Sequence, residues 1–253
     1  MQAAEKPRGW LYRFNGSLLS SGTKDFGFTG TANYGVGYDG TGQSYHHVVG
    51  TEGTSSTDAG AIYANGITDK FNPSGDFTIS TWFRDITAGK GSILALYTVI
   101  GTSTTQTGSV FGAPSQVATG WTATNTGRIQ KRFCGIRLNY TSGSIDIRVL
   151  SSNQNTGSQY RATPPANFDT TAWHHYAITR KDSTMMFFVD GVKIYNATVS
   201  GALYASPQVS VCGYWDSATT EPTKSSYAGY ADDFYVAEFC KWDSDFDPYA
   251  ITY

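Results

Sequence analysis

Acidic side chains are the first residues to test for chemistry, because a pair of carboxylates on one strand face can hydrolyse a glycosidic bond. In the alternating segment from Ser144 to Leu150 only one acid occurs, Asp146, and Arg148 follows on the same face. This pair indicates a salt bridge rather than an acid and a nucleophile. The nucleophile motif G-x-S-x-G is absent from the sequence. We therefore expect no catalytic residues and no enzyme activity.

Two pairs of adjacent histidines are candidates for metal chemistry: His46 with His47, and His174 with His175. Adjacent side chains on a strand point to opposite faces, so neither pair can chelate one metal ion alone. A hydrogen-bonded or exposed histidine is the simpler interpretation of each. We expect no histidine metal site.

Aromatic, amide and carboxylate side chains gather in two polar segments that suit a sugar ligand. Tyr214, Trp215 and Asp216 are consecutive, and Asn153 and Tyr160 stand in the second segment. An aromatic ring stacks on the C–H face of a sugar, while polar groups hydrogen-bond its hydroxyls. These five residues are the candidate ligand-binding residues. The same residue types also form protein–protein surfaces, and the sequence leaves both interpretations open.

β-Strands must position these residues. The segments 173–180 and 185–189 alternate apolar and polar side chains, and Asp190-Gly191 then predicts a tight hairpin turn, because such turns need positive φ. Large aromatics on these strands, Trp82, Trp173 and Phe187, are predicted to be buried in the core. A helix-like stretch is expected near 59–64. The predicted strands are 9–14, 45–49, 77–83, 92–99, 134–140, 144–150, 173–180, 185–189, 192–195, 209–213 and 231–239.

The predicted domain organisation is an N-terminal arm, residues 1–8, followed by a single domain, residues 9–253. A long insertion near 102–128 interrupts the strand series, and loops of this length are usually functional or mobile. Few charges, 15% aromatics and 28 glycines favour an all-β protein. A sandwich of this length can form one domain.

Three segments resemble the laminin G-like, concanavalin A-like jelly-roll superfamily. They are G-D-F-T-I-S-T-W-F-R from Gly75, W-H-H-Y-A-I-T-R from Trp173, and A-D-D-F-Y-V-A-E-F-C from Ala231. The resemblance covers nearly the whole chain and implies an all-β, two-sheet antiparallel β-sandwich, a jelly roll. The tail from Trp242 to Pro248 is similar to versions of this domain in bacteriophage virion proteins.

The resemblance also implies a possible metal site, since some members bind a structural Ca²⁺ near the start of the last core strand. Asp232 and Asp39 are the candidate ligands, because calcium takes several hard oxygen ligands. Capping of turns by aspartate is the alternative role. No cofactor is otherwise required. The E-x-D-x-E strand of the hydrolases in this superfamily is absent.

Composition excludes several partner classes. The net charge of −2 gives no basis for nucleic-acid binding, which needs a clustered basic surface. No apolar run has the length of a membrane span, so we expect no membrane insertion. The N-terminal segment has no hydrophobic signal core, which predicts synthesis in the host cytoplasm without a signal peptide. The cysteines Cys134, Cys212 and Cys240 suggest neither a zinc site nor a disulfide framework.

The function that the resemblance implies is a non-enzymatic bacteriophage virion protein on the particle surface, as a capsid decoration protein or fibre-associated adhesin that binds a cell-surface glycan. The alternatives are a stand-alone carbohydrate-binding lectin and a diverged glycoside hydrolase. The expected partners are other virion proteins and copies of the chain itself. Aromatics without a strand partner of their own are the predicted assembly contacts: Phe111, Trp121, Phe246, Tyr249 and Tyr253.

Overall fold

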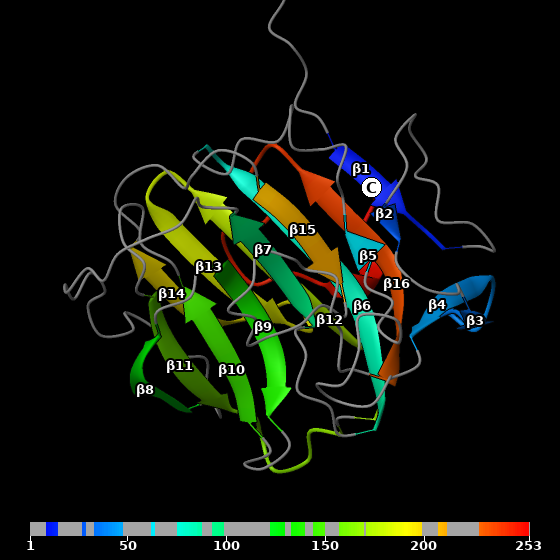
Figure 1. Cartoon of the computed structure of the whole chain (residues 1–253), viewed down its shortest axis with the longest axis horizontal. Helices are drawn as coiled ribbons and strands as arrows, with labels where there is room; N and C mark the ends of the chain where they lie inside the picture. The colour runs from blue at the N-terminus through cyan, green and yellow to red at the C-terminus, as the bar shows by residue number, and fades with distance from the viewer. Residues whose placement is uncertain are drawn as a thin grey trace, which may run out of the picture.

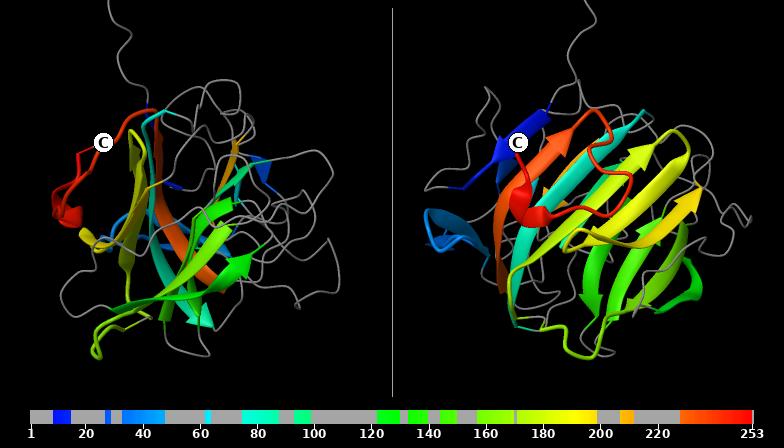
Figure 2. Two further views of the ribbon diagram at one scale, coloured as in Figure 1. Left: turned by 90° about the vertical axis from the view of Figure 1, so that its left-hand side faces the viewer. Right: turned by 180° about the vertical axis from the view of Figure 1, so that it is seen from behind.

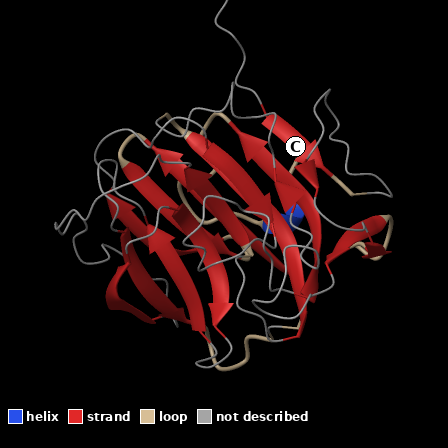
Figure 3. Ribbon diagram, viewed as in Figure 1, coloured by secondary structure: helices blue, strands red, loops and turns tan. Residues whose placement is uncertain are grey.

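A computed structural model shows two antiparallel β-sheets packed as two layers (Figure 1). In the described part of the chain nearly all regular structure is strand, with one short 3-10 helix, Pro248–Ala250 (Figure 3). The prediction of an all-β sandwich is confirmed. Among the described residues no helix is long and apolar enough to cross a membrane. The structure describes residues 9–14, 27–28, 33–47, 62–63, 75–87, 93–98, 122–129, 133–139, 144–149, 157–169, 171–198, 207–211 and 228–252.

The first sheet has the strand order β14-β13-β12-β6-β16-β4-β3, and β1 also pairs with β16. Every pairing in it is antiparallel. The strands are β1 (Gly9–Tyr12), β3 (Asn33–Val36), β4 (Gln43–His47), β6 (Phe77–Thr87), β12 (His174–Lys181), β13 (Thr184–Val189), β14 (Val192–Thr198) and β16 (Ala228–Ala237).

The second sheet has the order β2-β5-β15-β7-β9-β10-β11-β8, again antiparallel throughout. Figure 2 shows this sheet lying across one face of the first. The strands are β2 (Gly27–Phe28), β5 (Ile62–Tyr63), β7 (Leu94–Thr98), β8 (Thr122–Ile129), β9 (Phe133–Asn139), β10 (Ser144–Val149), β11 (Gly157–Thr163) and β15 (Pro207–Val211).

The core lies between the sheets and follows from strand alternation. In β6, Phe77, Ile79 and Phe83 are fully buried on the face toward the second sheet. Ile145 and Ile147 of β10 are buried from the other side. Burying a large apolar side chain contributes about 1.5–3 kcal/mol, so this alternation sets the register of the sandwich.

The predicted Asp190-Gly191 turn is confirmed. Asp190 has φ of 50° and Gly191 has φ of 75°, and Val189 pairs with Val192 across the turn. Two positive φ values are what a type I′ hairpin requires. Gly191 is required for a second reason, because a Cβ there would collide with the backbone of Phe246.

Several predictions differ from the structure. The helix expected near 59–64 is wrong where it is described, because Ile62–Tyr63 pairs as strand β5 with β2 and β15. The end of the predicted insertion, Thr122–Ile129, is edge strand β8. Residues 101–121 and the arm 1–8 lie outside the described residues. Trp82 and Phe187 are buried as predicted, but Trp173 is only half-buried, because it lies just before β12 at the end of the sheet.

Candidate ligand-binding face

The outer face of the first sheet is covered by the end of the chain. Residues 238–252, which we call the C-terminal strap, leave β16 and run back across the face that points away from the second sheet (Figure 2). Trp242 of the strap packs with Ala177, Met186 and Phe188 of β12 and β13, and Phe246 joins this cluster. The outer face therefore has a second, smaller hydrophobic cluster.

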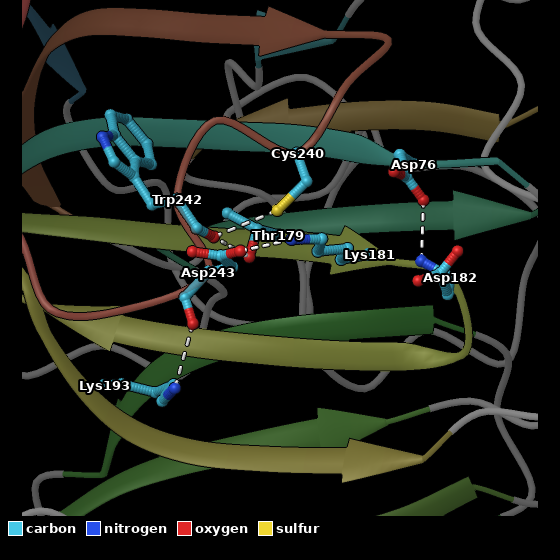
Figure 4. Close-up of polar contacts among 8 residues, drawn as sticks. All are labelled: Asp76, Thr179, Lys181, Asp182, Lys193, Cys240, Trp242 and Asp243. Atoms are coloured by element: carbon cyan, nitrogen blue, oxygen red, sulfur yellow. Dashed lines mark hydrogen bonds and ion pairs between the residues drawn. The ribbon is translucent and has the colours of Figure 1, made fainter.

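Polar contacts fix the strap at several points (Figure 4). Thr179 Oγ1 donates to the Trp242 carbonyl at 2.9 Å, and Lys181 Nζ pairs with Asp243 Oδ2 at 2.5 Å. Lys193 Nζ donates to the Asp243 carbonyl at 3.0 Å. The threonine lies in the buried layer and the lysines at its rim. The strap is thus anchored both beneath and along its edge.

The predicted assembly contacts in the strap also pack on their own domain. Phe246 stacks on Trp242 with ring centroids 4.2 Å apart, and its N–H donates to the Gly191 carbonyl at 2.9 Å. Tyr249 remains 75% exposed, although its ring lies 5.0 Å from that of Trp82. Tyr249 contact with another chain stays a prediction. Phe111, Trp121 and Tyr253 lie outside the described residues.

His175 lies completely buried beneath the strap. Its ring is edge-on to Trp82, Trp242 and Phe246, at centroid distances of 5.3, 5.6 and 5.7 Å. Neither ring nitrogen has a hydrogen-bond partner within the described part of the chain. Burial lowers the pKa of His175 to about 3, so the imidazole is neutral. His175 is a packing residue here, so the expectation of a hydrogen-bonded or exposed histidine is wrong for this position.

The two predicted metal ligands, Asp39 and Asp232, lie at one corner of the same face. Asp232 Oδ2 accepts from Tyr38 N–H at 3.2 Å, and its Oδ1 accepts from Asp233 N–H at 2.8 Å. Asp39 accepts from the Thr41 N–H at 2.8 Å and the Thr41 hydroxyl at 2.7 Å. Asp233 has φ of 42° at a bulge in β16, a strained backbone that turns its side chain toward the same corner.

The aspartates at this corner have pKa values shifted in different directions. Burial, together with the nearby Asp233 carboxylate, raises the pKa of Asp232 to about 7. Hydrogen bonds from Thr41 lower the pKa of Asp39. Burial raises the pKa of Asp233 as well, although Arg13 Nε, 3.9 Å from Asp233 Oδ1, favours the ionised form of that carboxyl group.

The side chains at this corner lack the arrangement of a cation site in the described part of the chain. Across the described ranges, no group of three or more histidine, cysteine, aspartate or glutamate side chains is arranged to hold a metal ion. Both oxygens of Asp39 and both of Asp232 accept hydrogen bonds within or beside the 37–42 turn. This is the capping role that the sequence left as the alternative. Calcium binding by these residues is untested, and because their oxygens already accept hydrogen bonds we expect the capping role instead.

Aromatic rings form a layer over Trp82, which is itself only 1% exposed. The Tyr38 ring stacks on it at 4.5 Å with an interplanar angle of 6°, and Tyr249 covers it from the strap. Tyr38 is half-buried and Tyr249 is exposed, so part of this layer faces solvent. Such ring faces are suited to stacking on a sugar.

Next to this layer, the Arg84 guanidinium lies against two aromatic rings. Its Cζ is 5.4 Å from the centroid of Trp173 and 4.5 Å from that of Tyr230. All three side chains are partly exposed. Sequence reasoning missed this group because it assigned Trp173 to the core. The available signal was the alternation in β6, which puts Arg84 on the same face as Trp82.

Of the five predicted sugar-binding residues, only Tyr160 lies within the described part of the chain. Tyr214, Trp215, Asp216 and Asn153 lie outside the described residues. Tyr160 lies in β11, opposite Ile147 of β10. Whether the five lie together is therefore untested, and their role in ligand binding stays a prediction.

The predicted pair of Asp146 and Arg148 lies in β10, between β9 and β11. In this register Asp146 stands opposite Arg137 on one side and Arg161 on the other. Three arginines therefore share a sheet neighbourhood with one acid. No second acid stands at a cross-strand position beside Asp146, as a pair of catalytic carboxylates requires.

Comparison with known families places the fold. Residues 67–238 match the family model described as the concanavalin A-like lectin/glucanases superfamily. A comparison with curated protein sequences found no significant match.

Solved structures are similar in fold at low sequence identity. Domain 4 of a GH43 extracellular arabinanase from Geobacillus stearothermophilus, solved with arabinotriose, is 13% identical, with a TM-score of 0.57 over 93% of this chain and 95% of that one. The botulinum neurotoxin serotype D/C binding domain is 16% identical, with a TM-score of 0.52 over 95% of this chain and 50% of that one. The chain thus spans about half the length of that toxin fragment. The fold is lectin-like.

Proposed function

The chain belongs to the concanavalin A-like lectin/glucanases superfamily, and from this membership we propose that it is a non-enzymatic carbohydrate-binding protein displayed on a bacteriophage particle. The fold is shared by lectins, adhesins and hydrolases, so the function depends on the side chains of the site.

The observation that carries the proposal is the aromatic outer face of the first sheet. Tyr38, Tyr249, Trp173 and Tyr230 present partly exposed rings beside the charged Arg84. Sugar sites combine ring faces for the C–H surface with a few polar groups for the hydroxyls. The arabinanase domain of similar fold was solved with arabinotriose, which supports the same class of ligand for this chain.

The absence of enzyme activity is supported by the state of the acids at the corner. Asp232 and Asp39 have pKa values shifted in opposite directions, a combination that hydrolases use for an acid and a nucleophile. However, Asp232 is 5% exposed and both of its oxygens accept backbone hydrogen bonds. A carboxyl group held in this way is not positioned to reach a glycosidic bond.

The particle location is supported by the resemblance of the tail from Trp242 to Pro248 to bacteriophage virion proteins. Tyr249 on the strap is a candidate contact with a neighbouring copy or with the shell, because its large ring is 75% exposed.

Two experiments test the two parts of the proposal separately. A glycan array probed with the full chain tests carbohydrate binding. We expect the chain to bind a small set of related glycans. If it binds none of them, carbohydrate binding is contradicted. Immunogold labelling of purified particles tests the location. Labelling of the capsid or fibre surface supports it, and absence of the chain from purified particles contradicts it.

A further inference from the structure

Trp173, Arg84 and Tyr230, which we call the arginine platform, come from three neighbouring segments of the first sheet. Arg84 stands directly opposite Tyr230 in the pairing of β6 with β16. Trp173 immediately precedes His174, which pairs with Phe83. The three side chains therefore form one row across the outer face, at the end of the sheet beyond the strap.

Within the described part of the chain, the Arg84 charge has no acidic partner. Among the residues that the structure describes, its side-chain contacts are the rings of Trp173 and Tyr230, and no carboxylate pairs with it. By contrast, Lys181 pairs with Asp243 and Arg13 with Asp233. A partly buried cation without a counter-charge is less stable than a paired one. An anionic ligand supplies the missing negative charge.

The contacts of Arg84 with Trp173 and Tyr230 are cation–π contacts. Such contacts give the N–H donors of the guanidinium no oxygen acceptor. Gly35 of β3 lies against the Tyr230 ring, where a Cβ would collide with the ring. Tyr230 is thus held in place, and an arginine that stacks on a fixed ring loses little freedom on binding.

We infer that the arginine platform binds a sugar acid, with the carboxylate of the sugar paired to Arg84 and its ring against Trp173. This inference rests on the proposed function and names its ligand class. A planar guanidinium matches a carboxylate through two parallel hydrogen bonds, and the adjacent indole supplies the stacking surface for the sugar. The guanidinium and the indole are adjacent, with Arg84 Cζ 5.4 Å from the centroid of the Trp173 ring.

The acidic corner does not oppose this assignment. Asp232 stands two residues from Tyr230 in β16, but its oxygens accept from Tyr38 N–H and Asp233 N–H instead of facing the platform. Arg13 partly neutralises Asp233. Among the described residues, Arg84 therefore supplies the charge of the platform and is not paired with a carboxylate.

The test is a calorimetric titration of the full chain with a panel of oligomeric sugar acids: galacturonate, glucuronate, mannuronate and sialic acid. Each is matched by a carboxyl-reduced oligomer of the same length. Arg84→Gln and Arg84→Lys are compared with Arg13→Gln, which removes the same charge away from the platform. Thermal melting of each variant shows whether it remains folded.

We expect at least one acidic oligomer to bind about 10- to 100-fold more tightly than its reduced form. Arg84→Gln should remove that preference, Arg84→Lys should keep only part of it, and Arg13→Gln should leave it intact. If acidic and reduced oligomers bind equally and folded Arg84→Gln binds like the parent chain, the inference fails while carbohydrate binding stands. Binding of neutral glycans only would also contradict the inference and leave carbohydrate binding standing. A chain that binds no glycan would contradict the proposed function as well.

Discussion

Replacing Trp82 by alanine should destabilise the protein far more than the same change at Trp173. Trp82 is 1% exposed and packs against Tyr38, Tyr249 and His175, so its removal leaves a cavity beneath the strap. Truncation of a buried tryptophan costs about 3–5 kcal/mol. For a domain of this size each kcal/mol lowers Tm by about 2–4 °C, which gives a fall of about 6–20 °C.

Trp173 is the matched control because it has the same side chain but is half-buried at the sheet end. Its loss removes partial burial and the contact with Arg84, so we expect a cost of about 1–2 kcal/mol. Melting followed by near-UV circular dichroism compares the two variants directly. If Trp173→Ala lowers Tm as much as Trp82→Ala, the described arrangement of the outer face is wrong.

Three further predictions concern the strap and the corner. Gly191→Ala should cost more than Gly40→Ala in melting experiments: both have φ of +75°, but only a Cβ at Gly191 meets the strap, at Phe246; equal costs would contradict that contact. His175 has a pKa of about 3 in the folded protein and about 6.5 in the unfolded chain. The free energy of unfolding should therefore fall as pH drops from about 6.5 toward 3, by up to about 1.4 kcal/mol per pH unit. A His175→Leu variant with the same dependence of stability on pH would refute this. Calcium should leave Tm unchanged relative to EDTA, because the Asp232 oxygens already accept hydrogen bonds; a large rise would assign the metal site.

The fold was predictable wherever local signals agreed. The Asp190-Gly191 turn and the alternating strands on either side need only short-range information, and the structure confirms them. The prediction was wrong for a short strand such as Ile62–Tyr63, because two residues carry no periodicity. The secondary structure of such a segment is set by its partner strands.

The candidate site was less predictable because it depends on pairing across distant segments. Asp39 and Asp232 were singled out as calcium ligands, which stays a prediction, and their hydrogen bonds at one corner depend on how the 37–42 turn sits against β16. Trp173 was placed in the core because a large aromatic beside a strand usually lies there. Only the sheet register shows that it ends up beside Arg84.

The central claim, that this chain binds carbohydrate without cleaving it, is tested most directly by titrating the full chain with the strongest ligand from the glycan array and recovering that ligand afterwards. We predict saturable binding, with the oligosaccharide recovered at its original length after prolonged incubation. Absence of saturable binding, or recovery of shortened oligosaccharide with the purified chain, would contradict the claim.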